Sequence, residues 1–277
     1  MRVLITGCSS GFGLETALEF ARRGHDVVAT LRNLSKRDRL DARVDAENLH
    51  LEVLPLDVTK PSSVARAVEA TLHEAPIDIL VNNAGFQIWT SIEEATDEDV
   101  TRQFDTNVVG MLRMTRAVLP SMRARKSGVI VNVSSVVGMT GSPFEGLYSA
   151  SKHAVEALSE TLEFEVRGFG VRVVVVQPGG YPTEFADNAR FGSQFDPTRS
   201  PYADGYRSWT GTLARMEGHT RADPRDVART IVDAATSTSP PLYWPVGAEA
   251  LLVDSLRRPV PFEDYEHALR TTLAWWD

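Results

Sequence analysis

The sequence predicts a single α/β domain whose doubly wound, Rossmann-like parallel sheet has about seven strands and helices on both faces. Three observations favour this class. Short β-branched runs alternate with longer helical stretches along the chain. A glycine-rich turn follows the first run directly, as in folds that bind a nucleotide at a helix start. The run 171–176 is apolar at almost every position, as expected for a central strand buried on both sides.

The individual elements follow from the same patterns. The predicted strands are 3–5, 26–31, 51–56, 77–81, 129–133, 171–177 and 242–244. The predicted helical stretches are 13–23, 62–73, 97–125, 148–167 and 224–235. The segment from about 185 to 218 breaks this alternation and holds six aromatic residues among many polar ones. We expect an irregular substrate lid there, because long excursions in compact α/β domains are more often functional than linkers.

Length, charge and cysteine content narrow the range of functions. The 277 residues are 43% hydrophobic and contain no linker or repeat, so residues 1–277 are expected to form one domain. The net charge of -8 argues against nucleic acid or an anionic membrane as a partner. A single cysteine, Cys8, excludes an internal disulfide and fits a reducing compartment. With no room for a signal peptide and no run long enough to cross a bilayer, a cytoplasmic protein is expected. The six histidines show no ligand spacing, so no metal site is expected.

Tyr148 and Lys152 carry the first sign of chemistry. They stand four residues apart and share one face of a predicted helix. A phenol has a pKa of about 10 and is a poor acid or base near neutral pH, but a protonated lysine one turn away lowers that pKa. This spacing is common by chance, and an isolated lysine is most often a solvated helix residue. Other motifs in the chain therefore decide how the pair is interpreted.

The turn at residues 6–13 reads T-G-C-S-S-G-F-G and opens the first helix. Gly7, Gly11 and Gly13 let the backbone turn sharply and let a pyrophosphate approach closely. The helix start adds unpaired N–H groups and the positive end of the helix dipole. The glycine spacing is neither G-x-G-x-x-G nor that of a P-loop. The alternative is a tight strand-to-helix turn that binds no ligand.

Together these features resemble the short-chain dehydrogenase/reductase family of the small single-domain type. The resemblance runs from residue 1 to about 183 and more loosely to about 247. The chain matches the family's T-G-x-x-x-G-x-G at 6–13, N-N-A-G at 82–85 and P-G-x-x-x-T at 178–183. Ser135 stands 13 positions before Tyr148, the usual separation in this family. The cofactor half is most similar to hydroxysteroid and retinol dehydrogenases.

The resemblance implies a catalytic tetrad of Asn107, Ser135, Tyr148 and Lys152. Tyr148 would exchange the proton with the carbonyl or alcohol oxygen, and Ser135 would hydrogen-bond that oxygen. Lys152 would lower the tyrosine pKa and bind the nicotinamide ribose. Asn107 would distort its helix and hold a water that links Lys152 to solvent. The alternatives are that Asn107 only caps or interrupts a helix, and that Ser134 or Ser135 merely ends a strand.

The family's cofactor contacts can be carried onto matching positions. They are Gly7, Ser9, Ser10, Gly11, Phe12, Gly13, Arg32, Asp57, Val58, Asn83, Ala84, Gly85, Tyr148, Lys152, Pro178, Gly179 and Thr183. The second predicted strand ends without an acid and runs into Arg32, which favours NADP(H) over NAD(H) because an arginine can pair with the 2′-phosphate. Alternatively, Arg32 lies on a solvated loop and Asp57 only caps the next turn.

Substrate contacts are expected at Gln87, Val137, Phe144 and Tyr181, in the segments where the family places its substrate. Their character suggests a small apolar carbonyl compound or alcohol, although the lid aromatics are equally suited to packing. The implied function is NADP(H)-dependent interconversion of a ketone or aldehyde and an alcohol by hydride transfer. The alternatives are a nicotinamide-dependent epimerase or dehydratase and a noncatalytic dinucleotide sensor. The family's usual association implies a homodimer or homotetramer, and the tail with Trp275 and Trp276 is expected to pack on the domain or on a second subunit.

Overall fold

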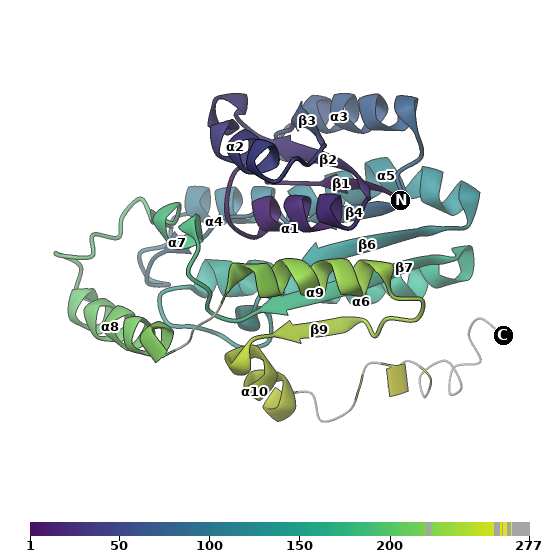
Figure 1. Cartoon of the computed structure of the whole chain (residues 1–277). Coiled ribbons are helices and arrows are strands. Elements are labelled where there is room, and N and C mark those ends of the chain that lie inside the picture. Colours follow the sequence, from purple (N-terminus) through teal and green to yellow (C-terminus); the bar gives the residue numbers. More distant parts are fainter. Residues whose placement is uncertain (220–222, 258–260, 262, 265–266, 268–277) are drawn as a thin grey trace.

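Seven parallel strands form the central sheet of the computed structural model, in the order β3-β2-β1-β4-β6-β7-β9 (Figure 1). The strands are β1 (Arg2–Ile5), β2 (Asp26–Leu31), β3 (Glu52–Pro55), β4 (Ile79–Asn82), β6 (Gly128–Val133), β7 (Val171–Pro178) and β9 (Tyr243–Val246). A separate two-stranded sheet pairs β5 (Ile88–Trp89) with β8 (Arg190–Phe191). The seven-stranded parallel sheet confirms the predicted fold class.

The structure describes residues 1–219, 223–257, 261, 263–264 and 267. The helices are α1 (Gly11–Arg22), α2 (Asp38–Ala46), α3 (Pro61–Glu74), α4 (Asp97–Phe104), α5 (Met111–Arg125), α6 (Gly146–Val166), α7 (Glu184–Asp187), α8 (Ala203–His219), α9 (Pro224–Thr236) and α10 (Ala248–Arg257). In the part of the chain described, no helix is both long and apolar enough to cross a membrane. The tail with Trp275 and Trp276 lies outside the described residues.

The strands are buried on both faces because successive side chains point to opposite sides of the sheet. In β1, Val3 and Ile5 pack in one core with α1 and α9, whereas Leu4 packs in a second core with α3, α5 and α6. These two layers of helices are visible on either side of the sheet (Figure 1). The near-continuous apolar strands of the sequence are explained by this arrangement.

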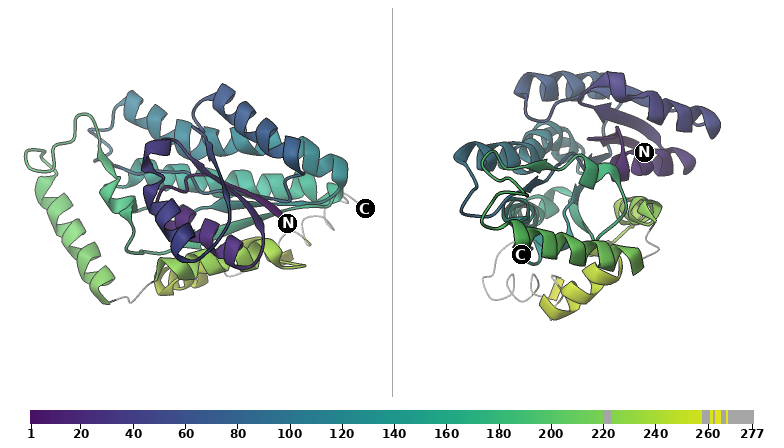
Figure 2. Two further views of the ribbon diagram at one scale, coloured as in Figure 1. Left: turned by 45° about the horizontal axis from the view of Figure 1, so that its top comes forward. Right: turned by 90° about the vertical axis from the view of Figure 1, so that its left-hand side faces the viewer.

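The strand order reverses at β1, which pairs with β2 on one side and β4 on the other. In parallel sheets the loops beyond the carboxyl ends diverge at such a point and leave room for a ligand. The glycine turn follows β1 and the N-N-A-G segment follows β4, so the topology brings these two motifs together. Figures 1 and 2 show α8 at the same end of the molecule, the end toward which the strands point.

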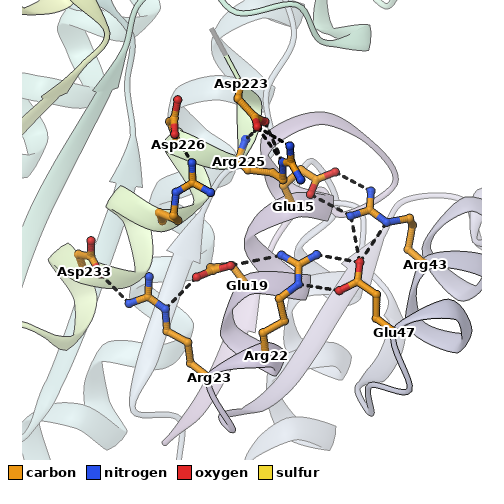
Figure 3. Close-up of polar contacts among 11 residues, drawn as sticks. Glu15, Glu19, Arg22, Arg23, Arg43, Glu47, Asp223, Arg225, Asp226 and Asp233 are labelled. Carbon is orange, nitrogen blue, oxygen red and sulfur yellow. Dashed lines mark hydrogen bonds and ion pairs between the residues drawn. The ribbon is translucent and has the colours of Figure 1, made fainter.

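Surface ion pairs hold α1 to its neighbours α2 and α9 (Figure 3). Arg43 of α2 pairs with Glu15 of α1 at 2.9 Å, and Arg23, which follows α1, pairs with Asp233 of α9 at 2.6 Å. An exposed pair contributes only about 0–1 kcal/mol. Their effect here is to help orient α1, the helix whose first turn contains Gly11 and Gly13 of the glycine turn.

Three sequence predictions need correction. The expected helix 97–125 is interrupted by a π-helical segment, Asp105–Gly110, between α4 and α5. The helices α2 and α10 were not predicted; α2 has Leu40 as its buried residue, so its apolar periodicity is weak. The excursion 185–218 is not wholly irregular, since α8 covers its second half. Glycines at positions 205 and 211 of α8 weaken the helical signal there.

Candidate active site

Tyr148, Lys152 and Ser135 meet at the carboxyl end of β6. Tyr148 and Lys152 lie one turn apart on the buried side of α6, and Lys152 Nζ is 5.6 Å from the centre of the Tyr148 ring. Lys152 Nζ donates a hydrogen bond of 2.7 Å to the carbonyl oxygen of Val133, the last residue of β6. Ser135 follows two residues later, and its side chain lies close enough to the Tyr148 hydroxyl to lower the pKa of that group. The structure therefore brings together three of the four predicted catalytic residues.

Burial shifts the pKa values of both ionisable groups in opposite directions, and in each case it favours the neutral form. Burial raises the pKa of Tyr148 because it penalises the phenolate; the hydrogen bond with Ser135 opposes this and the charge of Glu145 adds to it. Burial lowers the pKa of Lys152 to about 8, against the opposing charge of Glu156. The expected lowering of the tyrosine pKa by Lys152 is therefore not found: burial of the phenol sets the direction of the shift.

Asn107 lies within the π-helical segment, which confirms the predicted distortion of its helix. Its Nδ2 donates to the carbonyl oxygen of Phe86 and to Ser151 Oγ, both at 3.0 Å. Its Oδ1 accepts from the backbone N–H of Phe86 at 3.1 Å. Asn107 thus joins the loop after the N-N-A-G segment to the residue that precedes Lys152, and with Lys152 it lines one cavity.

A cavity of about 10 Å³, the size of one water molecule, lies beside Lys152. Its polar lining comes from Thr6, Asn82, Asn107 and Lys152. Oδ1 of Asn82 is buried without a hydrogen-bond partner in the described part of the chain. A buried oxygen without a hydrogen-bond partner, close to a lysine, is suited to bind a small polar molecule. The cavity is large enough for the water that the sequence analysis placed between Asn107 and Lys152, and that water stays a prediction.

The glycine turn is locked to the N-N-A-G segment by side chains from both. Thr6 Oγ1 accepts from the backbone N–H groups of Asn83 and Ala84 at 3.0 and 2.9 Å. Asn83 Nδ2 donates to the carbonyl oxygens of Thr6 and Gly7 at 2.9 and 3.1 Å. A Cβ at Gly13 would lie 2.2 Å from the Gly7 oxygen, so this position needs glycine. The structure thus explains the glycine spacing by close backbone approach, and it leaves the first N–H groups of α1 directed beyond the helix end.

The segment after β7 completes this cluster. Thr183 lies over Gly11, since a Cβ there would be 3.7 Å from the Thr183 Cβ. The ring of Tyr181 meets that of Phe12 edge-on at 5.7 Å. The backbone N–H of Gly179 donates a hydrogen bond of 2.9 Å to the carbonyl oxygen of Val246, the last residue of β9. Three segments far apart in sequence therefore surround the start of α1, as a dinucleotide site requires.

The predicted cofactor residues Arg32 and Asp57 lie at the ends of β2 and β3. Arg32 is exposed and has no ion pair among the described residues, whereas nearby Arg39 pairs with Glu184. Asp57 Oδ1 accepts from the N–H and hydroxyl of Thr59 at 3.0 and 2.7 Å. Asp57 therefore caps its own turn, which was the alternative interpretation; its contact with adenine stays a prediction. Val58 beside it is buried.

The predicted substrate residues do not form one group. Phe144 belongs to an aromatic cluster that joins the body to the lid, with Tyr206 at 5.5 Å and Phe195 at 6.1 Å between ring centres. Gln87 is buried and donates to Glu145 at 2.6 Å. The remaining two lie elsewhere: Val137 is buried in the turn after Ser135, and Tyr181 packs beside the glycine turn.

Phe185 is the aromatic residue that lies against Tyr148, with a distance of 5.4 Å between the two ring centres. It was expected only as one of several lid aromatics. The sequence feature that could have identified Phe185 is its position two residues after the P-G-x-x-x-T motif, at the start of α7. The start of the predicted lid segment thus lies beside Tyr148.

Comparisons with known proteins agree with this geometry. A family model described as short chain dehydrogenase matches residues 1–193. The chain is 39% identical over 247 residues to the 3-ketodihydrosphingosine reductase of Bacteroides thetaiotaomicron, covering 88% of this chain and 87% of that protein. It is 38% identical to retinol dehydrogenase 8 of Bos taurus, covering 87% of this chain and 79% of that protein.

Two solved structures share the whole fold. A short-chain dehydrogenase from Streptomyces avermitilis superposes with a TM-score of 0.79 at 33% identity, covering 98% of this chain and 97% of the other. A short-chain dehydrogenase/reductase from Burkholderia phymatum, solved in complex with NAD, gives a TM-score of 0.76 at 25% identity, covering 96% and 94%.

Proposed function

Because this chain belongs to the short-chain dehydrogenase/reductase family of oxidoreductases, we propose that it interconverts a ketone or aldehyde and the corresponding alcohol by hydride transfer. The observation that carries this proposal is the meeting of Ser135, Tyr148 and Lys152 at the carboxyl end of β6, beside the glycine turn. These groups are the ones that proton transfer to a carbonyl oxygen needs.

Each residue has a defined task in this reaction. Tyr148 donates its phenolic proton to the developing alkoxide in the direction of reduction, and Ser135 hydrogen-bonds the same oxygen. Lys152 stabilises the phenolate that remains, because its ammonium lies on the same helix face one turn away. The raised pKa of Tyr148 means that the free phenol holds its proton firmly, which suits an acid that releases it only as negative charge develops on the substrate.

The residues around the start of α1 fit a dinucleotide. The glycines admit close backbone approach, and the ammonium of Lys152 offers a polar contact at the same edge of the sheet. Gly7, Gly11, Gly13 and Thr183 would hold the pyrophosphate and Lys152 the ribose. When bound, the nicotinamide supplies or accepts the hydride.

NADP(H) is proposed as the favoured cofactor. Arg32 follows β2 directly, is exposed, and has no carboxylate partner in the described part of the chain, so it is available to a 2′-phosphate. The first carboxylate after β2 is Asp38, at the start of α2. The NAD complex of the Burkholderia phymatum relative means that family membership alone does not decide this preference.

An apolar substrate of moderate size is proposed from the aromatic surroundings of Tyr148. Phe185 contacts Tyr148 directly, and Phe144 joins the catalytic loop to the lid. The names of two relatives, a 3-ketodihydrosphingosine reductase and a retinol dehydrogenase, support a largely apolar carbonyl compound or alcohol as the substrate class.

The decisive experiment measures NADPH and NADH oxidation against a panel of ketones and aldehydes. A carbonyl reductase consumes one equivalent of cofactor for each carbonyl reduced. An epimerase or dehydratase would convert its substrate without net oxidation and keep its cofactor bound, and a dinucleotide sensor would bind cofactor without any turnover. Either of these results, obtained across the panel, would refute the proposal.

A further inference from the structure

Glu156 is a buried carboxylate one helical turn beyond Lys152 on α6, and it lies outside the proposed tetrad. Tyr148, Lys152 and Glu156 are each four residues apart, so all three lie on one face of the helix. A buried carboxylate is costly unless it is paired and hydrogen-bonded. Its position beside the reacting groups therefore calls for an explanation.

The carboxylate of Glu156 is bound to the ends of both central strands. Its Oε1 accepts a hydrogen bond of 2.8 Å from Ser134 Oγ, directly after β6. The same oxygen accepts a second bond, also 2.8 Å, from Gln177 Nε2 of β7. One carboxylate oxygen thus joins α6, β6 and β7 at the edge of the sheet where the site lies.

Three consecutive residues, the last of β6 and the two after it, each face a different turn of α6. Val133 accepts a hydrogen bond from Lys152 through its carbonyl oxygen, Ser134 donates one to Glu156, and the side chain of Ser135 lies close to the Tyr148 hydroxyl. A shift of Ser134 would therefore move Ser135 relative to the phenol. Glu156 provides the one contact in this series that involves neither reacting group.

The turn after Ser135 is built against the same carboxylate. A Cβ at Gly138 would lie 2.4 Å from Glu156 Oε1 and 2.5 Å from Ser134 Oγ. The 3₁₀ turn Val136–Gly138 consequently packs against Glu156 with no space to spare. A movement of the carboxylate toward Gly138 would therefore press on the turn that follows Ser135.

Glu156 also acts on Lys152 through its charge. Burial lowers the pKa of Lys152, and the negative charge of Glu156 opposes this. Tyr148 faces Lys152 from the same helix, and the side chains from β1, β4, β6 and the π-helical segment that line the cavity beside it are not titratable. In the described part of the chain, Glu156 is therefore the carboxylate that balances the lysine.

We propose that Glu156 is a positioning residue of the reaction: its carboxylate fixes the turn that carries Ser135 and supplies the negative charge that balances Lys152. The kinetic part of this role rests on the proposed carbonyl reduction, whereas the electrostatic part concerns the protein alone. The two parts can therefore be tested separately.

The electrostatic part is tested by NMR titration of the protein labelled with ¹³C at the lysine ε-carbons. The chain has only three other lysines, Lys36, Lys60 and Lys126, and all are exposed. Lys152→Arg assigns the signal of Lys152, which we expect to titrate near pH 8 in the wild type. Glu156→Gln keeps the shape and removes the charge, and we expect the midpoint to fall by about one pH unit.

The matched control is Glu163→Gln, which removes a buried carboxylate near the far end of the same helix, where it accepts from the Val173 N–H at 2.7 Å. Its lysine midpoint should equal that of the wild type. An unchanged midpoint in Glu156→Gln, or an equal fall in Glu163→Gln, would overturn the electrostatic part.

The positioning part is tested with Ser134→Ala, which removes one hydrogen bond and keeps the charge of Glu156. We expect kcat to fall about 2–10-fold, the equivalent of one hydrogen bond, with the KM for NADPH and the lysine midpoint unchanged. Glu156→Asp, which shortens the reach and keeps the charge, should also lower kcat and serves where Glu156→Gln does not fold. Wild-type kcat in both variants would overturn this part. Failure of the wild type to reduce any carbonyl would refute the proposed function, and the NMR titration would still decide the electrostatic part.

Discussion

Lys152 Nζ donates a hydrogen bond of 2.7 Å to the carbonyl oxygen of Val133, so the ammonium group is held at the end of the strand that leads to Ser135. Burial lowers the pKa of this amine to about 8. The lysine is charged below its pKa and neutral above it, so carbonyl reduction should decline as pH rises through about 8. Initial rates between pH 6 and pH 10 measure this. Lys152→Arg should abolish that decline or move it upward, since a guanidinium stays charged there; a wild-type rate that is constant to pH 10 would contradict the role of the cation.

Tyr148→Phe should reduce kcat by about 10²–10⁴-fold, the usual contribution of a general acid, while NADPH still binds. The substitution removes only the hydroxyl and keeps the ring contact with Phe185. Binding is followed by NADPH fluorescence and turnover by NADPH oxidation. Tyr202→Phe, in which an exposed hydroxyl that contacts Glu93 is removed, is the control and should leave kcat unchanged. Wild-type turnover in Tyr148→Phe would remove its assignment as the acid.

Gly13→Ala should abolish NADPH binding or weaken it at least about tenfold, because a Cβ there meets the Gly7 oxygen at 2.2 Å and Asn83 Nδ2 at 2.4 Å. Overpacking of this kind costs about 1–3 kcal/mol and displaces the turn from the N-N-A-G segment. Calorimetric titration with NADPH, together with thermal unfolding, measures both effects. Gly141→Ala adds the same methyl group where no atom lies within 4 Å, and it should bind NADPH normally. Equal affinities of the two variants for NADPH would contradict the close contact of Gly13 with Gly7 and Asn83.

The order of motifs was sufficient to predict the sheet and the place of the site, because each motif follows a strand and the carboxyl ends of parallel strands share one edge. The contact of Gly13 with Asn83 joins residues 70 positions apart, and nothing local in the sequence reveals it. The pKa of Tyr148 depends on how deeply the phenol is buried, which its spacing from Lys152 does not reveal. Glu156 could have been noticed as the next residue at helical spacing after Tyr148 and Lys152. Its two hydrogen bonds could not be predicted, because they depend on how β6 and β7 are aligned with each other.

Asp99 anchors the lid to the body of the protein, and Asp99→Asn should loosen it. The fully buried carboxylate accepts from the N–H and the hydroxyl of Ser193, each at 2.8 Å. Losing charge-assisted bonds of this kind costs about 1–3 kcal/mol. Limited proteolysis should cleave near Ser193 faster in Asp99→Asn than in the wild type, whereas Asp97→Asn, at an exposed position of the same helix turn, should behave as wild type. Equal cleavage rates in all three proteins would contradict the anchor.

The same anchor has a predictable response to acid. Burial alone would raise the pKa of Asp99, but hydrogen bonds from Ser193 and Thr96 outweigh it and the pKa is lowered. A carboxyl whose pKa is lower in the folded state contributes its full stability above its ordinary pKa of about 3.9 and loses it as pH falls further. Lid cleavage by an acid-active protease should therefore be constant from neutral pH to about 4 and rise below that value. In Asp99→Asn the rate should be high throughout; a wild-type rate that already rises near neutral pH would assign the response to another group.

Arg32→Asp should raise the KM for NADPH far more than the KM for NADH. Arg32 directly follows β2, and the two other arginines close by are already paired, Arg37 with Asp41 and Arg39 with Glu184. The substitution removes a charge-assisted contact to the 2′-phosphate and introduces a carboxylate that repels it. We expect the KM for NADPH to rise about 10–100-fold, the equivalent of about 1.5–3 kcal/mol of binding free energy. NADH lacks that phosphate and should change little. Arg66→Asp introduces the same charge change at an exposed position of α3 and controls for long-range electrostatics. If the two cofactors are weakened equally by Arg32→Asp, or if Arg66→Asp has the same effect, Arg32 does not contact the phosphate and the preference for NADP(H) has another origin.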